Sequence, residues 1–243
     1  MSFVRLQHVH KHYRLGEIDV PALSDITLDL APGRFTVLSG PSGSGKTTLL
    51  NVIGCLDRPD RGELTVMNAA VLHLSEDALA DFRARHIGFI FQNFNLIPVL
   101  SAFENIEYPL RLTGVSAAVR RRRVRHLLEA VGLADRADNV PGQLSGGQRQ
   151  RVAVARALAT TPALVMADEP TANLDSQTGA SILALMRQMQ QEMQVSFVFS
   201  SHDPDVLAAA DDAVFICDGR VTRTQQCTPH QAHPDRLGQG RAA

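Results

Sequence analysis

The chain has 243 residues, of which 44% are apolar, and 24 Lys and Arg stand against 25 Asp and Glu. This length and composition suit one large domain with a buried core, and the balanced charge excludes the overall basic excess that is typical of nucleic-acid-binding proteins. The three cysteines are scattered without metal-ligand spacing, which argues against a disulfide framework or a zinc site.

The first part of the chain is predicted to be rich in strands. Its opening stretches alternate apolar and polar side chains with the period of a half-buried strand, and the Pro32–Gly33 turn leads into a further strand. Ser75, followed by acidic residues, is a candidate helix N-cap. The predicted strands are residues 3–9, 23–30, 34–40 and 86–92, and the predicted helices are residues 46–56 and 75–86.

Helical patterns dominate from residue 93 to residue 160. Val124, Leu127, Leu128 and Val131 fall at i, i+3, i+4 and i+7, which predicts the buried face of a helix. The arginine run at 120–123, with Arg125, is interpreted as the solvated face of that helix; contact with RNA or anionic lipid is the alternative.

Strand patterns return at 163–168, 196–201 and 213–219, with a helical stretch at 178–190. This alternation predicts an α/β fold with a parallel sheet, interrupted by a helical insert. We therefore expect a single domain over residues 1–224, followed by a flexible tail at 225–243. Within the domain we expect an α/β lobe formed by 1–92 and 161–224 and a helical subdomain at 93–160.

Gly40, Gly45, Lys46 and Thr47 form the pattern G-x-x-x-x-G-K-T between a predicted strand and a predicted helix. In that context the backbone N–H groups of the loop can surround a phosphate chain. Lys46 can reach the β and γ phosphates, and the Thr47 hydroxyl can bind Mg²⁺. A glycine-rich turn that matches by chance is the alternative.

Asp168 and Glu169 follow the apolar residues of "ALVMADEP", where a parallel strand is expected to end. Asp168 suits the coordination shell of Mg²⁺, and Glu169 suits the polarisation of an attacking water. Adjacent acids in a solvated turn are the alternative, but the phosphate loop earlier in the chain favours the catalytic interpretation.

Three further side chains are candidates with structural alternatives. Gln92, at a predicted strand end, could orient a water or touch Mg²⁺, and His202 could hydrogen-bond a γ-phosphate; a surface amide and a structural histidine are the alternatives. Tyr13 could stack on a nucleobase, since aromatic faces accept any base, or pack at a sheet edge.

The stretch "LSGGQ" resembles a second phosphate-binding element. Ser145 and Gln148 form a capping-box pattern at the start of a predicted helix, and Gly146 and Gly147 leave N–H donors open to an anion. The same residues would also serve simply as a well-capped helix start.

Together, "GPSGSGKT", "FIFQ", "LSGGQ", "LVMADEP", "NLD" and "SSHD" resemble the ordered motifs of an ABC-type ATPase over roughly residues 3–222. The stretch "ADEPTANLDSQTG" is similar to the corresponding segment in the macrolide-export and lipoprotein-release (MacB/LolD-like) branch. The resemblance implies a P-loop ATPase with a RecA-like parallel-sheet core, an N-terminal antiparallel β subdomain and a helical insert. Thr47, Ala172 and Ser201 stand where the branch commonly has Ser, Gly and Thr, and these departures remove no catalytic group.

The resemblance also implies site roles in a head-to-tail homodimer that binds ATP and Mg²⁺. Glu169 would be the general base, assisted by His202, Gln92 and Lys46; Thr47, Gln92 and Asp168 would serve the metal. Asp175 would couple the two sites, and the LSGGQ of one chain would close the ATP site of the other. The nucleotide-binding residues would be Tyr13, Gly40, Pro41, Ser42, Gly43, Ser44, Gly45, Lys46, Thr47, Thr48, Ser145, Gly146, Gly147, Gln148 and Asp175.

The implied partner is an integral membrane permease in a separate chain, gripped near Gln92 and residues 93–105. No run of about 18 apolar residues predicts a membrane span, and the N-terminus lacks a signal-peptide core, so we expect a cytoplasmic protein held at the membrane by that partner. The expected activity is ATP hydrolysis coupled to transport, for export or envelope mechanotransmission. An FtsE-like cell-division regulator and a soluble DNA- or ribosome-associated ATPase are the alternatives, although no nucleic-acid partner is expected.

Overall fold

Two sheets frame the molecule in the computed structural model, which describes residues 3–16 and 18–227. The strands are β1 Val4–Leu15, β2 Ile18–Leu30, β3 Phe35–Ser39, β4 Arg61–Val66, β5 Ala69–Ala70, β6 Ile87–Ile90, β7 Leu164–Asp168, β8 Ser196–Ser200, β9 Asp212–Cys217 and β10 Arg220–Gln226. The order in the six-stranded sheet is β10-β9-β3-β8-β7-β6, parallel except for β10. The second sheet is antiparallel, with the order β2-β1-β4-β5.

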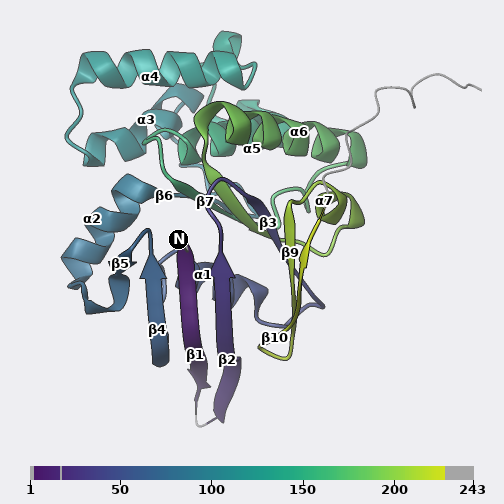
Figure 1. Cartoon of the computed structure of the whole chain (residues 1–243). Helices are drawn as coiled ribbons and strands as arrows, with labels where there is room; N and C mark the ends of the chain where they lie inside the picture. Colours follow the sequence, from purple (N-terminus) through teal and green to yellow (C-terminus); the bar gives the residue numbers. More distant parts are fainter. Residues whose placement is uncertain (1–2, 17, 228–243) are drawn as a thin grey trace, which may run out of the picture.

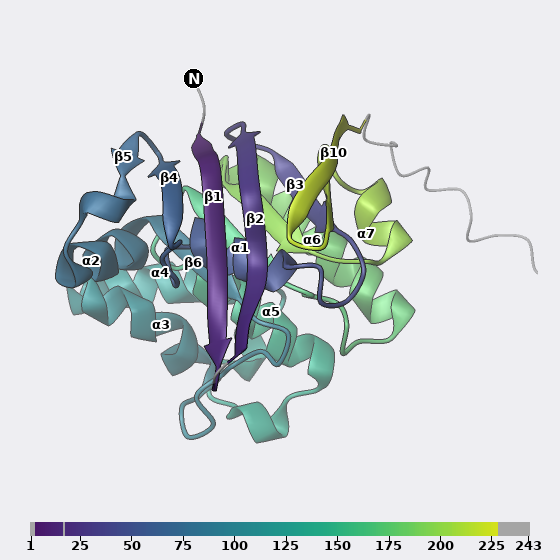
Figure 2. The same ribbon diagram turned by 90° about the horizontal axis from the view of Figure 1, so that it is seen from below.

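Helices cover both faces of the six-stranded sheet (Figure 1). The helices of the described residues are α1 Lys46–Ile53, α2 Glu76–His86, α3 Ala102–Leu112, α4 Ala117–Ala130, α5 Gly146–Ala157, α6 Ser176–Met193 and α7 Pro204–Ala208, with short 3-10 turns at Val71–His73, Ala134–Arg136 and Pro141–Gln143. Of these, α4 lies farther from the sheet and packs against α3 and α5. Figure 2 shows α1 behind β1 and β2, so that this helix lies between the two sheets. No helix in the described part of the chain combines the length and the apolarity needed to cross a bilayer.

Alternate residues of the parallel strands enter two separate cores. Phe197 and Phe199 of β8 face the cluster formed with α3 to α6, whereas Val198 between them faces the cluster formed with α1 and the antiparallel sheet. Phe35 and Phe199 meet edge to face with ring centroids 4.2 Å apart, an arrangement worth about 1 kcal/mol beyond simple burial. Because both faces are covered, β3 and β8 are buried along their whole length and β7 is buried up to Asp168 at its end, and most of their residues are apolar.

Three helices, α3, α4 and α5, lie within residues 93–160, the range that the sequence assigns to a helical subdomain. The arginine run of α4 is only partly a solvated face. Arg121, Arg122 and Arg125 are exposed, but Arg120 donates to Glu107 Oε1 at 3.0 Å. Arg123 donates to Leu158 O at 3.0 Å. Helical spacing could not show these contacts, because both partners lie outside α4.

Several element boundaries differ from the prediction, and two of these differences bear on the candidate site and on the end of the domain. The strand expected to reach Gln92 ends at Ile90, because the chain turns there toward the helical subdomain. Gln225 and Gln226, which the sequence assigns to the tail, are strand residues of β10 and pair with Ala213 and Asp212 of β9. The rest of the predicted tail, residues 228–243, lies outside the described residues.

The order of the parallel strands positions the candidate site. β8 lies between β3 and β7, and Asp168 is directly opposite Ser200 in the β7–β8 register. The loops after these three strands therefore emerge at the same edge of the sheet, the carboxyl edge at which α/β proteins bind ligands.

Candidate functional site

The glycine-rich loop joins β3 to α1, as predicted. Gly45 has φ of +101°, and a Cβ there would lie 2.6 Å from Ala22 O, so only glycine fits. Gly45 gives α1 no side-chain cap. The first N–H groups of α1 are thus available to an anion, with the positive end of the helix dipole behind them.

Lys46 is turned into this loop. Its side chain is buried, and Nζ donates to Gly40 O at 2.8 Å and to Pro41 O at 2.9 Å. The Ser44 hydroxyl is buried and has no hydrogen-bond partner among the described residues. A buried ammonium and an unsatisfied hydroxyl are the groups that a phosphate chain would satisfy.

Thr47, Asp168 and Ser200 meet at the carboxyl edge of the sheet. Thr47 Oγ1 lies 3.1 Å from Asp168 Oδ1, and the Ser200 hydroxyl donates to the same carboxylate oxygen. A hydroxyl and a carboxylate are hard oxygen ligands. The pair fits Mg²⁺, which commonly takes only one or two protein ligands and completes its shell with waters and substrate phosphates. The described residues contain no cluster of three or more His, Cys, Asp or Glu that could form a full protein cage for a metal.

Glu169 and His202 form the next layer of the site. His202 Nδ1 lies 3.0 Å from Glu169 Oε1. The backbone N–H of Glu169 donates to Ser200 O at 3.2 Å and to Ser200 Oγ at 3.1 Å, and Glu169 has φ of +44°, a conformation that non-glycine residues rarely adopt. The Glu169 side chain is 19% exposed. β8 therefore fixes the backbone of Glu169, whereas its carboxylate contacts His202 and stays accessible to a small reactant.

Gln92 and Asp175 lie near a polar contact that Asn173 makes within the α/β lobe. Asn173 Nδ2 donates to Gln92 O at 3.0 Å, whereas the side chain of Gln92 is exposed. Asp175 caps α6 by accepting from Thr178 N at 2.9 Å, and the hydrogen bonds from Thr178 hold the pKa of Asp175 below its ordinary value. Asn173 was not predicted from the sequence as a site residue.

The LSGGQ stretch starts α5 with the predicted reciprocal capping. Ser145 Oγ accepts from Gln148 N at 3.3 Å, and Gln148 Oε1 accepts from Ser145 N at 2.8 Å. Gly147 lies against α6, because a Cβ at this position would be 2.6 Å from Thr178 Cγ2. In the described part of the chain, no hydrogen bond joins residues 144–148 to the phosphate loop.

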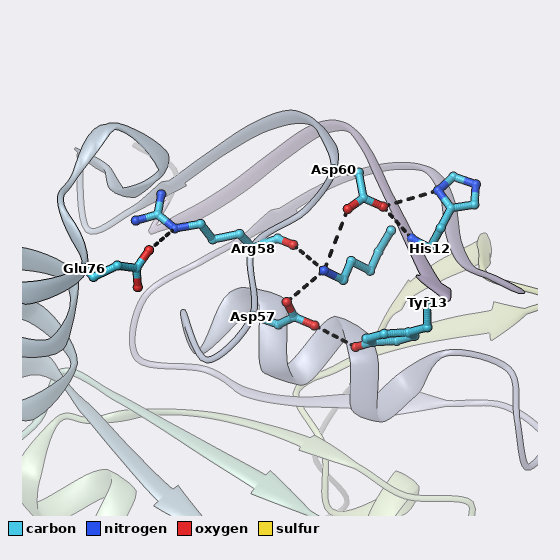
Figure 3. A network of polar contacts seen from close by, with 7 residues as sticks. His12, Tyr13, Asp57, Arg58, Asp60 and Glu76 are labelled. Carbon is cyan, nitrogen blue, oxygen red and sulfur yellow. Dashed lines mark hydrogen bonds and ion pairs between the residues drawn. The ribbon is translucent and has the colours of Figure 1, made fainter. Parts of the chain in front are cut away.

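Tyr13 stands at the end of β1 beside the segment that follows α1. Its side chain is 37% exposed, and its hydroxyl donates to Asp57 Oδ2 at 2.8 Å (Figure 3). Lys11 Nζ lies over the Tyr13 ring, 5.3 Å from its centroid. Lys11 and Asp57 were not identified from the sequence as site residues. Lys11 and Tyr13 are two positions apart, so a strand would place them on the same face, and this spacing is a signal that the sequence contains. Asp57 has no such signal, because it comes near Tyr13 only in the folded chain.

The comparisons with known proteins agree with this geometry. A sequence model described as ABC transporter matches residues 23–172. A macrolide export ATP-binding/permease protein of Syntrophobacter fumaroxidans is 49% identical over 91% of this chain, which spans 31% of that relative. An ABC transporter ATP-binding protein of Thermotoga maritima is 46% identical over 90% of this chain and 93% of its own length.

A solved structure gives the same result for the fold. The ATP-binding cassette MJ0796, in a dimeric post-hydrolysis state bound to ADP and Pi, superposes with a TM-score of 0.85 at 42% identity. The match covers 93% of this chain and 99% of that one. The phosphate loop, the acid pair at the end of β7 and the capped LSGGQ helix thus occur here in the fold of an ABC cassette. The chain belongs to the ABC transporter family and is an ATP-binding subunit with the fold of an ABC ATPase.

Proposed function

We propose that the chain hydrolyses ATP at a composite site between two copies and uses the cycle to drive a separate membrane subunit. One observation supports this most strongly. Thr47, Asp168, Glu169 and His202 converge at one edge of the sheet, whereas the LSGGQ helix start makes no hydrogen bond to the phosphate loop of its own chain. One chain thus has one half-site built around the phosphate loop and a second half-site at the LSGGQ helix start.

The phosphate loop would bind the triphosphate through backbone N–H groups and Lys46. The ammonium of Lys46 would exchange its two loop carbonyls for β- and γ-phosphate oxygens, a stronger, charge-assisted contact. Thr47 and Asp168 would hold Mg²⁺, which would neutralise charge on the β and γ oxygens. Ser200 keeps the Asp168 carboxylate oriented through its hydrogen bond.

Glu169 would accept the proton of the attacking water. His202 would orient Glu169 through the 3.0 Å contact and reach toward the γ-phosphate from its exposed position. Gln92 would transmit the presence of Mg²⁺ to the helical subdomain through the turn that follows it, where Arg156 of α5 donates to Phe94 O at 2.8 Å. This division of labour matches phosphoryl transfer, in which positioning and electrostatics supply most of the catalysis.

The second copy would close the site with residues 145–148. The start of α5 offers N–H groups of Gly146 and Gly147 to a γ-phosphate, and Ser145 adds a hydroxyl. Asp175, next to this helix start in the fold, would couple the two sites. The solved cassette is dimeric and bound to ADP and Pi, which supports a dimer of two copies of this chain.

The membrane subunit would dock at a cavity of about 200 Å³ between the catalytic lobe and α3. Its lining includes Phe89, Phe91, Tyr108 and Leu112, and Leu112 is 67% exposed. An exposed apolar patch beside the Gln92 turn suits the insertion of a short helix from a partner. We propose that this partner is a permease in a separate chain, active in export or envelope mechanotransmission, and that it holds the ATPase at the cytoplasmic face of the membrane.

A site-specific crosslinking experiment tests the docking site. A photoreactive residue at Leu112 should capture an integral membrane protein in cells that make the native complex. The same residue at Ile18, which is also 67% exposed but lies on the β1–β2 hairpin, should not. Leu112→Glu should abolish co-purification of that protein while ATP binding stays intact. Equal capture from both positions would contradict the docking proposal.

A further inference from the structure

A polar network links Tyr13 to the segment that follows α1 (Figure 3). Asp57 stands at its centre: Oδ2 accepts from the Tyr13 hydroxyl at 2.8 Å and Oδ1 accepts from Lys11 Nζ at 2.8 Å. Lys11 Nζ also donates to Arg58 O at 2.8 Å and lies 3.8 Å from Asp60 Oδ1. One carboxylate therefore fixes both the hydroxyl of the ring and the cation that lies over it.

Asp57 is in turn fixed to the helix that carries the phosphate loop. Its backbone N–H donates to Asn51 O of α1 at 3.2 Å. The neighbouring Arg58 is held by Glu76 Oε1 at 2.9 Å and by Leu72 O at 2.8 Å. A chain of short contacts thus runs from the phosphate loop through α1 and Asp57 to the Tyr13 ring.

The protonation states strengthen this connection. Burial alone would raise the pKa of Asp57, but the hydrogen bonds from Lys11 and Tyr13 outweigh it and hold that pKa below its ordinary value. Burial and the hydrogen bond to Asp57 raise the pKa of Tyr13, so its hydroxyl keeps its proton at neutral pH. Asp57 is then a charged acceptor for a neutral hydroxyl, which is the stronger class of hydrogen bond. The ring is held in one orientation before any nucleotide arrives.

We propose that Asp57 is a positioning residue for the nucleotide base. It holds the Tyr13 ring at a fixed place relative to the phosphate loop, so that the base and the triphosphate are engaged together without further ordering of the side chain. The inference rests on the proposed function, in which Tyr13 stacks on the base. Because stacking accepts any base, the network serves ATP and GTP alike and contributes nothing to a ligand that has no base.

Binding of three ligands tests the role: ATP, GTP and inorganic tripolyphosphate, each with Mg²⁺, titrated into the full chain. Tyr13→Phe keeps the ring and loses the hydroxyl, and Asp57→Ala loses the acceptor. Each variant should bind ATP and GTP about three- to tenfold more weakly, as expected when a charge-assisted hydrogen bond is lost. Tripolyphosphate affinity should stay at the wild-type value, and the double variant should bind ATP no more weakly than Asp57→Ala alone.

Asp60→Ala is the matched control. It removes an acid that approaches Lys11 and accepts from His12 N at 2.6 Å but has no contact with Tyr13. All three affinities should be unchanged in this variant.

Two further outcomes separate this inference from the function on which it rests. If Tyr13→Ala bound ATP as tightly as the wild type, the stacking role and the inference would both fail. If Tyr13→Ala lost affinity while Tyr13→Phe and Asp57→Ala kept it, the positioning role alone would be overturned. An equal loss of tripolyphosphate binding in Asp57→Ala would likewise overturn it, because the effect would then be structural.

Discussion

The substitution Glu169→Gln isolates one chemical property of the site. Glutamine has the shape of glutamate but cannot accept a proton from water. The backbone N–H of residue 169 keeps its hydrogen bonds to Ser200, and the amide can still reach His202. The loop after β7 should therefore remain in place, and the loss of the base should be the main change.

The expected magnitude follows from the contacts of Glu169. A positioned general base contributes about 10² to 10⁴ in rate, which corresponds to about 3–5 kcal/mol in the barrier. Lys46 and Thr47 make none of their hydrogen bonds with Glu169. ATP binding should therefore be preserved while turnover falls, and the bound nucleotide should keep two copies together.

Phosphate release measures the turnover, and size-exclusion chromatography with ATP and Mg²⁺ measures the trapped dimer. Asp205→Asn is the matched control, since Asp205 lines a cavity of about 870 Å³ together with Glu169 and His202 but its side chain makes no hydrogen bond or ion pair with either of them. This control should turn over ATP like the wild type. Near-normal turnover in Glu169→Gln, or an equal loss in Asp205→Asn, would refute the assignment of the base.

Three other changes have expected outcomes. Lys46→Ala should weaken binding of a fluorescent ATP analogue at least tenfold, because a buried ammonium leaves the phosphate loop; unchanged binding would contradict its role. Gly88→Ala places a Cβ 2.2 Å from Ala157 O and should lower the free energy of unfolding in urea by about 1–3 kcal/mol, whereas Gly142→Ala, with nothing within 4 Å, should not. Burial would raise the pKa of Asp211, but hydrogen bonds from Arg187 and Phe35 N outweigh it and lower that pKa below 3.8; the stabilisation is present above that value and is lost as the pH falls through the folded pKa. Asp211→Asn should therefore flatten the acid limb of the stability curve, and identical acid limbs would argue against this role.

The sequence predicted those parts of the fold whose signal is local. The apolar strands β3, β7 and β8 were recognisable from their composition, and the capping pattern of Ser145 and Gln148 occurs as predicted. β10 was missed because its residues are mostly polar and exposed. This edge strand forms through backbone pairing with β9, and no side-chain pattern in the sequence predicts that pairing.

The candidate site, like the fold, was predictable only where the signal is local in the sequence. Motif residues could be placed at strand ends, and parallel strands bring their carboxyl ends together. The contact of Tyr13 with Asp57 spans 44 positions of the chain, and the contact of Arg123 with Leu158 O spans 35. Contacts of this kind depend on how elements pack, so periodicity and short motifs cannot identify them.

A mixed dimer tests the central claim, that each ATP lies between the phosphate loop of one copy and the LSGGQ of the other. One chain carries Ser145→Arg and its partner carries Lys46→Ala, with different affinity tags so that only mixed dimers are assayed. The mixed dimer has one intact composite site, and each homodimer has none. We expect ATP hydrolysis by the mixed dimer well above that of either homodimer. Equal inactivity of all three would contradict the composite site and leave LSGGQ as a helix cap alone.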